Sequence, residues 1–324
     1  MAAPTGTSSF KVDGKTAIIT GAGSGINYCF AKLLLSRNCN VLIADLALRP
    51  EAQRLVDEYT GKDGKPRAVF VKTNVTLWPD LSNMFDQADK EFGGADIVCP
   101  GAGVFEPPFS NFWIPPGDPK SKDDPSGEKG SGLGHYGLLD INVTHPIRTS
   151  QLAISRWLNP PKDSKVGKAS PMNPKRLVHI SSIAGQMPGF PIPLYIASKH
   201  AVSGFVRSLG PLEESLGIRV NGVAPGIIKT PLFTDNPEKL KLFDEASDTW
   251  VMPEEVAEQM LRCCEASDVT GGWILEVLKD KYRNVEWQNA PGPEGTGSTV
   301  SNTAEMGRDV FDWLAMPGWG TVQK

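Results

Sequence analysis

The sequence predicts an α/β fold built on a single, mostly parallel β-sheet. Short runs of β-branched and aliphatic residues alternate with amphipathic stretches along most of the 324 residues, which is typical of βαβ units. The runs are apolar throughout, as expected for strands that helices cover on both faces. About seven strands are predicted, at residues 16–20, 40–45, 66–75, 95–103, 177–181, 218–223 and 273–278.

Three stretches interrupt this alternation, and we interpret them as additions to one domain that spans residues 1–283. Residues 106–134 and 159–176 are polar and contain several prolines, which is typical of long loops or lids. Residues 284–324 are rich in glycine and proline but contain tryptophan. We therefore expect an irregular C-terminal extension that packs against the domain or against a partner subunit.

The composition argues against several classes of function. A net charge of −4 without runs of lysine or arginine argues against nucleic-acid binding. No run approaches the roughly 18 apolar residues of a membrane span, and the N-terminus lacks the apolar core of a secretory signal. The five cysteines form no CxxC pair and have no histidine at metal-ligand spacing. We expect a soluble cytoplasmic protein with free thiols and no metal site.

The segment TGAGSGIN, Thr20 to Asn27, follows the first predicted strand and has the form of a turn that binds a dinucleotide. Gly21 allows a tight turn, and Gly23 and Gly25 let the backbone approach a pyrophosphate without a clash from Cβ atoms. The helix that begins near Gly25 directs its N–H groups and the positive end of its dipole toward the phosphates. An ordinary strand-to-helix turn is the alternative.

Asp45 ends the second predicted strand, at the distance from the turn that is expected for a carboxylate binding the adenosine ribose. A carboxylate accepts hydrogen bonds from the ribose hydroxyls and would repel a 2′-phosphate. The next arginine is Arg49. We therefore expect NAD rather than NADP as the cofactor. A helix cap or a solvated acid is the alternative role for Asp45.

Tyr195 and Lys199 stand four residues apart in the segment YIASK, on one face of a predicted helix. A free phenol has a pKa of about 10, which is too high for a base at neutral pH. A nearby ammonium favours the phenolate, which would make Tyr195 a proton shuttle for an alcohol. The spacing alone also fits a partly exposed tyrosine beside a solvated lysine.

Other motifs decide between these alternatives. Ser182, in HISSIAG, lies 13 residues before Tyr195; Asn142 stands in LLDINVTHPI; and VNGVAPGIIKTPL follows a later strand. With the glycine turn, these motifs make residues 12–278 resemble the classical branch of the short-chain dehydrogenase/reductase family. The resemblance implies a doubly wound Rossmann fold that transfers hydride between NAD(P) and a carbonyl or an alcohol.

The resemblance implies a role for each of four catalytic side chains. Tyr195 is the general acid/base, and Lys199 holds the nicotinamide ribose and lowers the pKa of Tyr195. Ser182 hydrogen-bonds the substrate oxygen and stabilises developing alkoxide charge. Asn142 holds a water that relays protons from Lys199 to solvent. The neighbouring Ser181 is expected to be structural.

The same resemblance assigns contacts with the cofactor to loops that follow the strands. The expected contacts are Gly21, Gly23, Ser24, Gly25, Ile26, Asn27, Asp45, Leu46, Asn74, Val75, Gly101, Ala102, Gly103, Tyr195, Lys199, Pro225, Gly226, Ile228 and Thr230.

Three places depart from the pattern of the family. Asn27 stands where the turn usually ends in glycine, so it should shift the packing of the helix or reach a cofactor oxygen. Pro100 to Gly103 replaces Asn-Asn-Ala-Gly, which removes an asparagine bridge to neighbouring strands. Asn74 replaces a common acid and still offers an amide to the adenine amino group. Because the catalytic residues are intact, we expect a functional variant of the site.

Aromatic residues in the insertion 106–134 and in residues 227–250, at the position of the family's substrate loop, suggest a sizeable apolar pocket. In these features the chain is similar to the NAD-linked 15-hydroxyprostaglandin dehydrogenase-like group and to fungal enzymes of secondary metabolism such as 5′-hydroxyaverantin dehydrogenase. We expect NAD-dependent oxidation of a secondary alcohol on a bulky hydrophobic, lipid-like or polyketide-like substrate.

Three other functions are the alternatives to this one. The same residues could reduce a bulky ketone. A nucleotide-sensing protein should have lost at least one of the four catalytic side chains, and none is lost. A non-redox cyclisation with the cofactor as scaffold would form no NADH. The family is usually dimeric or tetrameric through helices around Asn142 and Tyr195, so we expect a homodimer or homotetramer.

Overall fold

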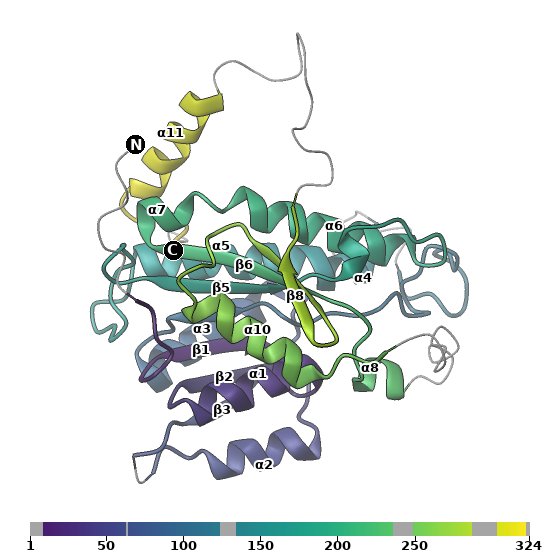
Figure 1. The fold of residues 1–324 in the computed structure, drawn as a ribbon, viewed down its shortest axis with the longest axis horizontal. Coiled ribbons are helices and arrows are strands. Elements are labelled where there is room, and N and C mark those ends of the chain that lie inside the picture. The colour runs from purple at the N-terminus through teal and green to yellow at the C-terminus, as the bar shows by residue number, and fades with distance from the viewer. Residues whose placement is uncertain (1–8, 63, 124–133, 236–248, 287–302, 322–324) are drawn as a thin grey trace.

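The structure, a computed structural model, describes residues 9–62, 64–123, 134–235, 249–286 and 303–321. These residues form one eight-stranded sheet in the order β3-β2-β1-β4-β5-β6-β7-β8, with helices on both faces (Figure 1). The strands are β1 (Thr16–Thr20), β2 (Asn40–Asp45), β3 (Ala68–Lys72), β4 (Ile97–Cys99), β5 (Lys175–Ile180), β6 (Ile218–Pro225), β7 (Ile274–Leu278) and β8 (Lys281–Asn284). The predicted α/β fold is confirmed.

The seven predicted strands are β1 to β7, and they pair in parallel. The eighth strand, β8, was not predicted; it pairs antiparallel with β7 at the edge of the sheet. Its sequence KYRN is polar and largely exposed, so no apolar run marks it. The strand order reverses beside β1, which pairs with β2 on one side and with β4 on the other. In sheets of this kind ligands bind beyond the carboxyl ends of the strands at such a reversal.

Helices of three kinds connect the strands. The α-helices are α1 (Gly25–Ser36), α2 (Pro50–Glu58), α3 (Trp78–Phe92), α4 (Gly137–Leu139), α5 (His145–Leu158), α6 (Pro193–Ser208), α7 (Leu212–Leu216), α8 (Pro231–Thr234), α10 (Pro253–Glu265) and α11 (Thr303–Ala315). A π-helix, η1 (Asp140–Thr144), leads into α5, and a 3₁₀ helix, η2 (Ile183–Gly185), follows β5.

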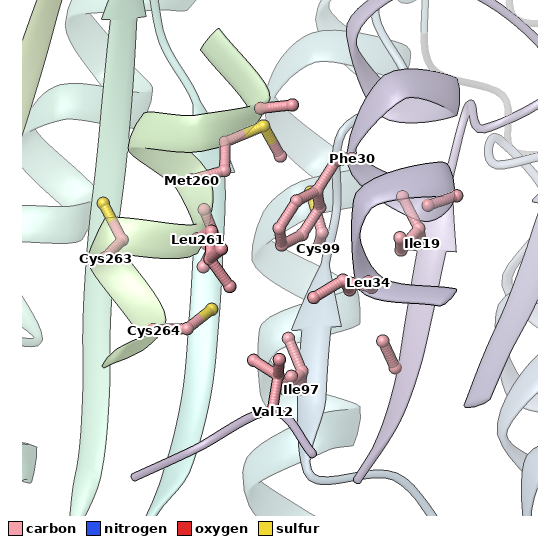
Figure 2. Close-up of a cluster of buried hydrophobic side chains, with 14 of the residues drawn as sticks. Val12, Ile19, Phe30, Leu34, Ile97, Cys99, Met260, Leu261, Cys263 and Cys264 are labelled. Atoms are coloured by element: carbon pink, nitrogen blue, oxygen red, sulfur yellow. The ribbon is translucent and has the colours of Figure 1, made fainter. Parts of the chain in front are cut away.

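Two apolar clusters cover the two faces of the sheet. Because side chains alternate along a strand, Ile19 of β1 belongs to one cluster and Ile18 to the other. The first cluster lies under α1 and α10, and Figure 2 shows Phe30 and Leu34 of α1 pointing toward Leu261 of α10. All five cysteines are free thiols and four of them are buried, as expected. Among the residues that the structure describes, no helix is long and apolar enough to cross a membrane.

The C-terminal extension is not irregular throughout, because residues 303–315 form α11. Leu314 is buried in the second apolar cluster, and Phe311 packs against that cluster. After the helix, the Trp319 carbonyl accepts hydrogen bonds from Ser155 Oγ (3.1 Å) and Asn159 Nδ2 (3.0 Å), at and just beyond the end of α5. The extension therefore packs against its own chain. Of the insertion at 106–134, residues 124–133 lie outside the described part.

Candidate active site

A cleft of about 480 Å³ lies at the carboxyl ends of the strands, around the reversal of strand order. It is lined by every residue expected to contact the cofactor except Gly23, and Ser182 also lines it. Asn142 does not line it. Thr73, Val104 and Ile180 line the cleft but were not predicted. They lie in or beside strands and read as core positions in the sequence.

The backbone of the glycine turn is as tight as its sequence indicates. Gly21 and Gly25 have φ angles of +72° and +61°, a left-handed conformation that favours glycine. A Cβ atom on Gly21 would stand 2.7 Å from the Cα of Ala102, so the turn and the loop after β4 are in close contact. Gly23 lies outside the cleft lining, and its N–H donates a hydrogen bond to Asp45.

Asp45 is held by backbone on both sides of its carboxylate. Its Oδ2 accepts a hydrogen bond from the Gly23 N–H at 2.8 Å, and its Oδ1 accepts one from the Leu46 N–H at 2.7 Å. This arrangement fixes a negative charge in the lining of the cleft. Arg49, the nearest downstream arginine, forms an ion pair with Asp235 just beyond α8, and both residues line the cleft.

Asn27 and Gly101, two of the departures from the family pattern, lie against each other. A Cβ atom on Gly101 would stand 2.3 Å from the Asn27 Oδ1, so any larger residue there would collide with the amide. The Asn27 side chain is 8 % exposed, and its Oδ1 lies 3.9 Å from the Cys99 thiol. The amide therefore fills the space that a side chain at position 101 would occupy. The two departures form one compensating exchange in packing.

Tyr195 and Lys199 lie one turn apart on α6 and both line the cleft. The Lys199 Nζ lies 5.4 Å from the centroid of the Tyr195 ring and donates a hydrogen bond to the Ile180 carbonyl at 2.9 Å. Burial lowers the pKa of Lys199 to about 8. Ser181, by contrast, bonds the Ser203 hydroxyl at 2.7 Å inside the protein, in agreement with a structural role.

The pKa of Tyr195 moves in the direction opposite to the one expected from Lys199. Burial raises the pKa of Tyr195 to about 12, because a phenolate loses its hydration, and a hydrogen bond with the Ser182 side chain offsets part of this rise. Ser182 stands at the start of η2, where its Oγ also accepts a hydrogen bond from the Ala184 N–H at 3.2 Å. The pair is thus arranged to keep a protonated phenol beside a hydroxyl donor.

Asn142 lies in the π-helix η1, and π-helical turns are frequent at functional sites. Its Oδ1 accepts a hydrogen bond from the Val104 N–H, and its Nδ2 donates to the Val104 carbonyl, both at 2.9 Å. The Nδ2 also lies 3.2 Å from the Ser198 Oγ. The Asn142 amide therefore ties the loop after β4 to α6, next to Lys199.

An aromatic group closes the Tyr195 end of the cleft. The ring of Phe105 lies 4.7 Å from the ring of Tyr195 and 5.5 Å from that of Phe233, and Trp250 follows at 6.0 Å from Phe233. Val104, Leu232 and Phe233 also line the cleft. This wall suits an apolar substrate more than a charged one. Phe243, an aromatic residue of the predicted substrate loop at 227–250, lies outside the described residues.

Comparisons with known proteins agree with this geometry. A sequence model of the family described as short chain dehydrogenase matches residues 15–241. The hydroxynaphthalene reductase-like protein Arp2 of Metarhizium guizhouense is 31 % identical over 226 residues, which cover 69 % of this chain and 72 % of that protein. The cyclohexanol dehydrogenase of an Acinetobacter species is 30 % identical over 263 residues, which cover 81 % and 92 %.

The fold also matches solved structures. The structure of an NADPH-dependent 3-quinuclidinone reductase from Rhodotorula rubra aligns with a TM-score of 0.62 and 19 % identity, covering 86 % of this chain and 95 % of that one. At this identity the likeness establishes the fold alone. The match of the family model to most of the chain, together with these relatives, shows that the protein belongs to the short-chain dehydrogenase/reductase family.

Proposed function

We propose that the protein is an NAD-dependent dehydrogenase that oxidises a secondary alcohol on a bulky hydrophobic substrate to a ketone. Membership of the family makes it an oxidoreductase that acts on alcohols or ketones with a nicotinamide cofactor. The observation that carries the finer proposal is the meeting of Tyr195, Ser182 and Lys199 at one end of a cleft that has the Asp45 carboxylate in its lining.

The residues of the cleft fit a dinucleotide. Gly21 and Gly25 line the cleft and have no side chain there, so a pyrophosphate could approach the backbone of the turn. Asp45 would bind the adenosine ribose, and Lys199 the nicotinamide ribose. When bound, the cofactor supplies the ring that accepts the hydride from the alcohol carbon.

The chain's own residues would move the proton. Ser182 would donate a hydrogen bond to the substrate oxygen and so hold the alcohol beside Tyr195. The Tyr195 phenolate would take the hydroxyl proton as the C–H electron pair leaves as hydride, so that the C–O bond becomes a carbonyl. Lys199, beside the phenol, would favour the phenolate, and the loop held by Asn142 would keep Lys199 in place.

Two observations support NAD over NADP. The Asp45 carboxylate would face a 2′-phosphate with like charge, and Arg49, which could offset that charge, is paired with Asp235. The distant structural neighbour from Rhodotorula is NADPH-dependent, but its likeness concerns the fold. The names of the two relatives, which act on cyclohexanol or resemble a hydroxynaphthalene reductase, support a cyclic substrate.

Reduction of a bulky ketone is the second candidate, because the raised pKa of Tyr195 favours the protonated phenol that ketone reduction requires.

We further propose a cytoplasmic homodimer or homotetramer with its dehydrogenase domain in residues 1–283. The exposed residues of α6 include the small residues Ala197, Ala201 and Ser208, which would allow a second copy to approach closely. The free, mostly buried thiols suit a reducing compartment.

Absorbance of NADH on mixing the purified protein with NAD and cyclohexanol, menthol or testosterone tests the proposed function. We expect NADH formation with at least one of these secondary alcohols, and a kcat/KM with NADP lower by about tenfold or more, since each 1.4 kcal/mol of repulsion is a factor of ten. The proposal would be rejected if no NADH formed with these alcohols and no NADH were consumed with the matching ketones. Equal use of NADP would reject the role of Asp45.

The pH dependence separates oxidation from reduction. Oxidation needs the Tyr195 phenolate, whose pKa burial raises to about 12, so the rate should increase from about pH 6 to about pH 8. Above that range the ammonium of Lys199, whose pKa is lowered to about 8, is lost, and the increase should level off. Ketone reduction uses the protonated phenol and should not increase. Initial rates in both directions at constant ionic strength measure this, and an oxidation rate that falls from pH 6 to 8 would contradict it.

A further inference from the structure

Two consecutive residues after β4 hold opposite parts of Tyr195. The ring of Phe105 packs edge-on against the Tyr195 ring, with centroids 4.7 Å apart. The next residue, Glu106, reaches the backbone instead: its Oε2 accepts a hydrogen bond from the Tyr195 N–H at 2.8 Å. The sequence offered no sign of this contact, because Glu106 opens a polar, proline-containing insertion.

The start of α6 has no cap of its own. Ile192, the residue before the helix, has no side-chain atom that accepts a hydrogen bond, and Pro193 has no N–H. The first free donors are the N–H groups of Leu194 and Tyr195. These are the second and third residues of α6, whose N–H groups a capping side chain normally satisfies. The Glu106 carboxylate accepts the hydrogen bond from the Tyr195 N–H, and its interaction with the Leu194 N–H offsets part of the rise in its pKa. A residue 89 positions away thus takes the place of the missing cap.

Holding Glu106 in this position is costly for the fold. The residue is only 6 % exposed, and burial raises the pKa of its carboxyl group. Its φ angle is +27°, in the left-handed region that non-glycine residues seldom adopt. Its other oxygen, Oε1, accepts a hydrogen bond from the Phe112 N–H at 3.2 Å. Strained backbone and buried charge of this kind persist where the surroundings fix them, and they cluster at functional sites.

We propose that Glu106 is a positioning residue for Tyr195: it fixes the first turn of α6 so that the phenol stays beside Ser182. The proposal rests on the proposed function, in which Tyr195 is the acid/base. Glu106 does not line the cleft, so it acts through Tyr195 and not on the substrate. Its effect is local, because Tyr195 stands in the first turn of α6, whereas Lys199 stands one turn further on and is held by the Ile180 carbonyl.

Loss of the carboxylate should therefore separate catalysis from cofactor binding. In the full-length Glu106→Ala variant we expect kcat to fall about 10- to 100-fold, since a misplacement of about 1 Å can cost 100-fold. The Kd of NAD should change by less than about threefold, because neither Asp45 nor the glycine turn contacts Glu106. Glu106→Gln keeps one accepting oxygen and should lie between Glu106→Ala and the wild type.

Glu213→Gln is the matched control. Glu213 on α7 also accepts a hydrogen bond from a backbone N–H, that of Gly271 at 2.6 Å, and pairs with Arg219, but it lies away from α6's first turn. This substitution should lower the midpoint of thermal unfolding without changing kcat. A fall in kcat as large in Glu213→Gln as in Glu106→Gln would show a general loss of stability and overturn the proposal.

Two readouts keep the outcomes distinct. Kinetics use the panel alcohol, or the matching ketone, that the wild type turns over fastest, with Tyr195→Phe beside it. If Tyr195→Phe is inactive and both Glu106 variants keep the wild-type kcat, the positioning role is wrong although the proposed function stands. If Tyr195→Phe is fully active, the proposed function fails.

Amide hydrogen exchange tests the capping of α6 by Glu106 in either case. Exchange at Leu194 and Tyr195 should accelerate about fivefold or more in Glu106→Ala, and unchanged exchange would overturn the proposal.

Discussion

Tyr195→Phe should lower kcat by about 10²- to 10⁴-fold, the range that a lost general acid/base produces. The substitution removes one oxygen and keeps the ring, so the edge-on contact with Phe105 at 4.7 Å remains. Burial raises the pKa of Tyr195 to about 12, so the phenol is protonated at neutral pH. In the proposed mechanism the removed hydroxyl carries the transferred proton in either direction. Among the residues that the structure describes, no other tyrosine lines the cleft. The loss is measured as steady-state NADH formation with the fastest alcohol of the panel.

NAD binding should survive this substitution, because the adenosine end of the cleft is untouched. The carboxylate of Asp45 keeps its two backbone hydrogen bonds, and Lys199 keeps its bond to the Ile180 carbonyl. Fluorescence titration with NADH should give a Kd within about twofold of the wild-type value. Tyr59→Phe, at the end of α2, is the matched control and should change neither quantity. More than about a tenth of the wild-type kcat in Tyr195→Phe would mean that another group transfers the proton.

Most of the sheet could be predicted because its strands are buried on both faces and therefore apolar throughout. The five residues of β1 are all buried, and its predicted bounds match those of the structure. Strand ends were less certain: the run at 66–75 shortens to Ala68–Lys72, where hydrogen bonding to β2 ends. The polar edge strand β8 left no such signal. Helix α11 was hidden by the glycine and proline around it, although Phe311 and Leu314 have helical spacing.

The site shows a different limit. The family resemblance places individual residues, and the structure brings nearly all of them to one cleft. Contacts between residues far apart in sequence were beyond its reach. Glu106 reads as an exposed acid in a polar insertion, but it caps α6. The rise in the pKa of Tyr195 depends on the burial of the phenol, which spacing alone does not reveal. Likewise Asn27 and Gly101 read as two separate departures until their contact was known.

That contact predicts a large effect for Gly101→Asn, which would restore the residue usual in the family. An added Cβ would stand 2.3 Å from the Asn27 Oδ1 and 2.6 Å from its Cγ. Asn27 is in the first turn of α1 and Gly101 lies two residues beyond β4, and the Asn27 side chain is buried. Overpacking of this kind costs about 1–3 kcal/mol. Because both residues line the cleft, the Kd of NAD should also rise, by about tenfold or more. Gly307→Asn is the control, since nothing lies within 4 Å of a Cβ there.

The reciprocal substitution should rescue this variant. Asn27→Gly alone opens a void and places glycine inside α1, which costs about 1 kcal/mol. Combined with Gly101→Asn, however, it clears the space that the new side chain needs, so the double variant should be more stable than Gly101→Asn alone. We expect a favourable coupling of about 1–3 kcal/mol between the two sites in a double-mutant cycle measured by urea unfolding, with NADH affinity recovering in parallel. Effects that add within about 0.5 kcal/mol would show that the two positions are independent, and Asn27 would then need another explanation. Coupling with recovered affinity would mean that an asparagine amide can fill the same space from position 27 or from position 101, and that the cofactor site keeps its shape in either case.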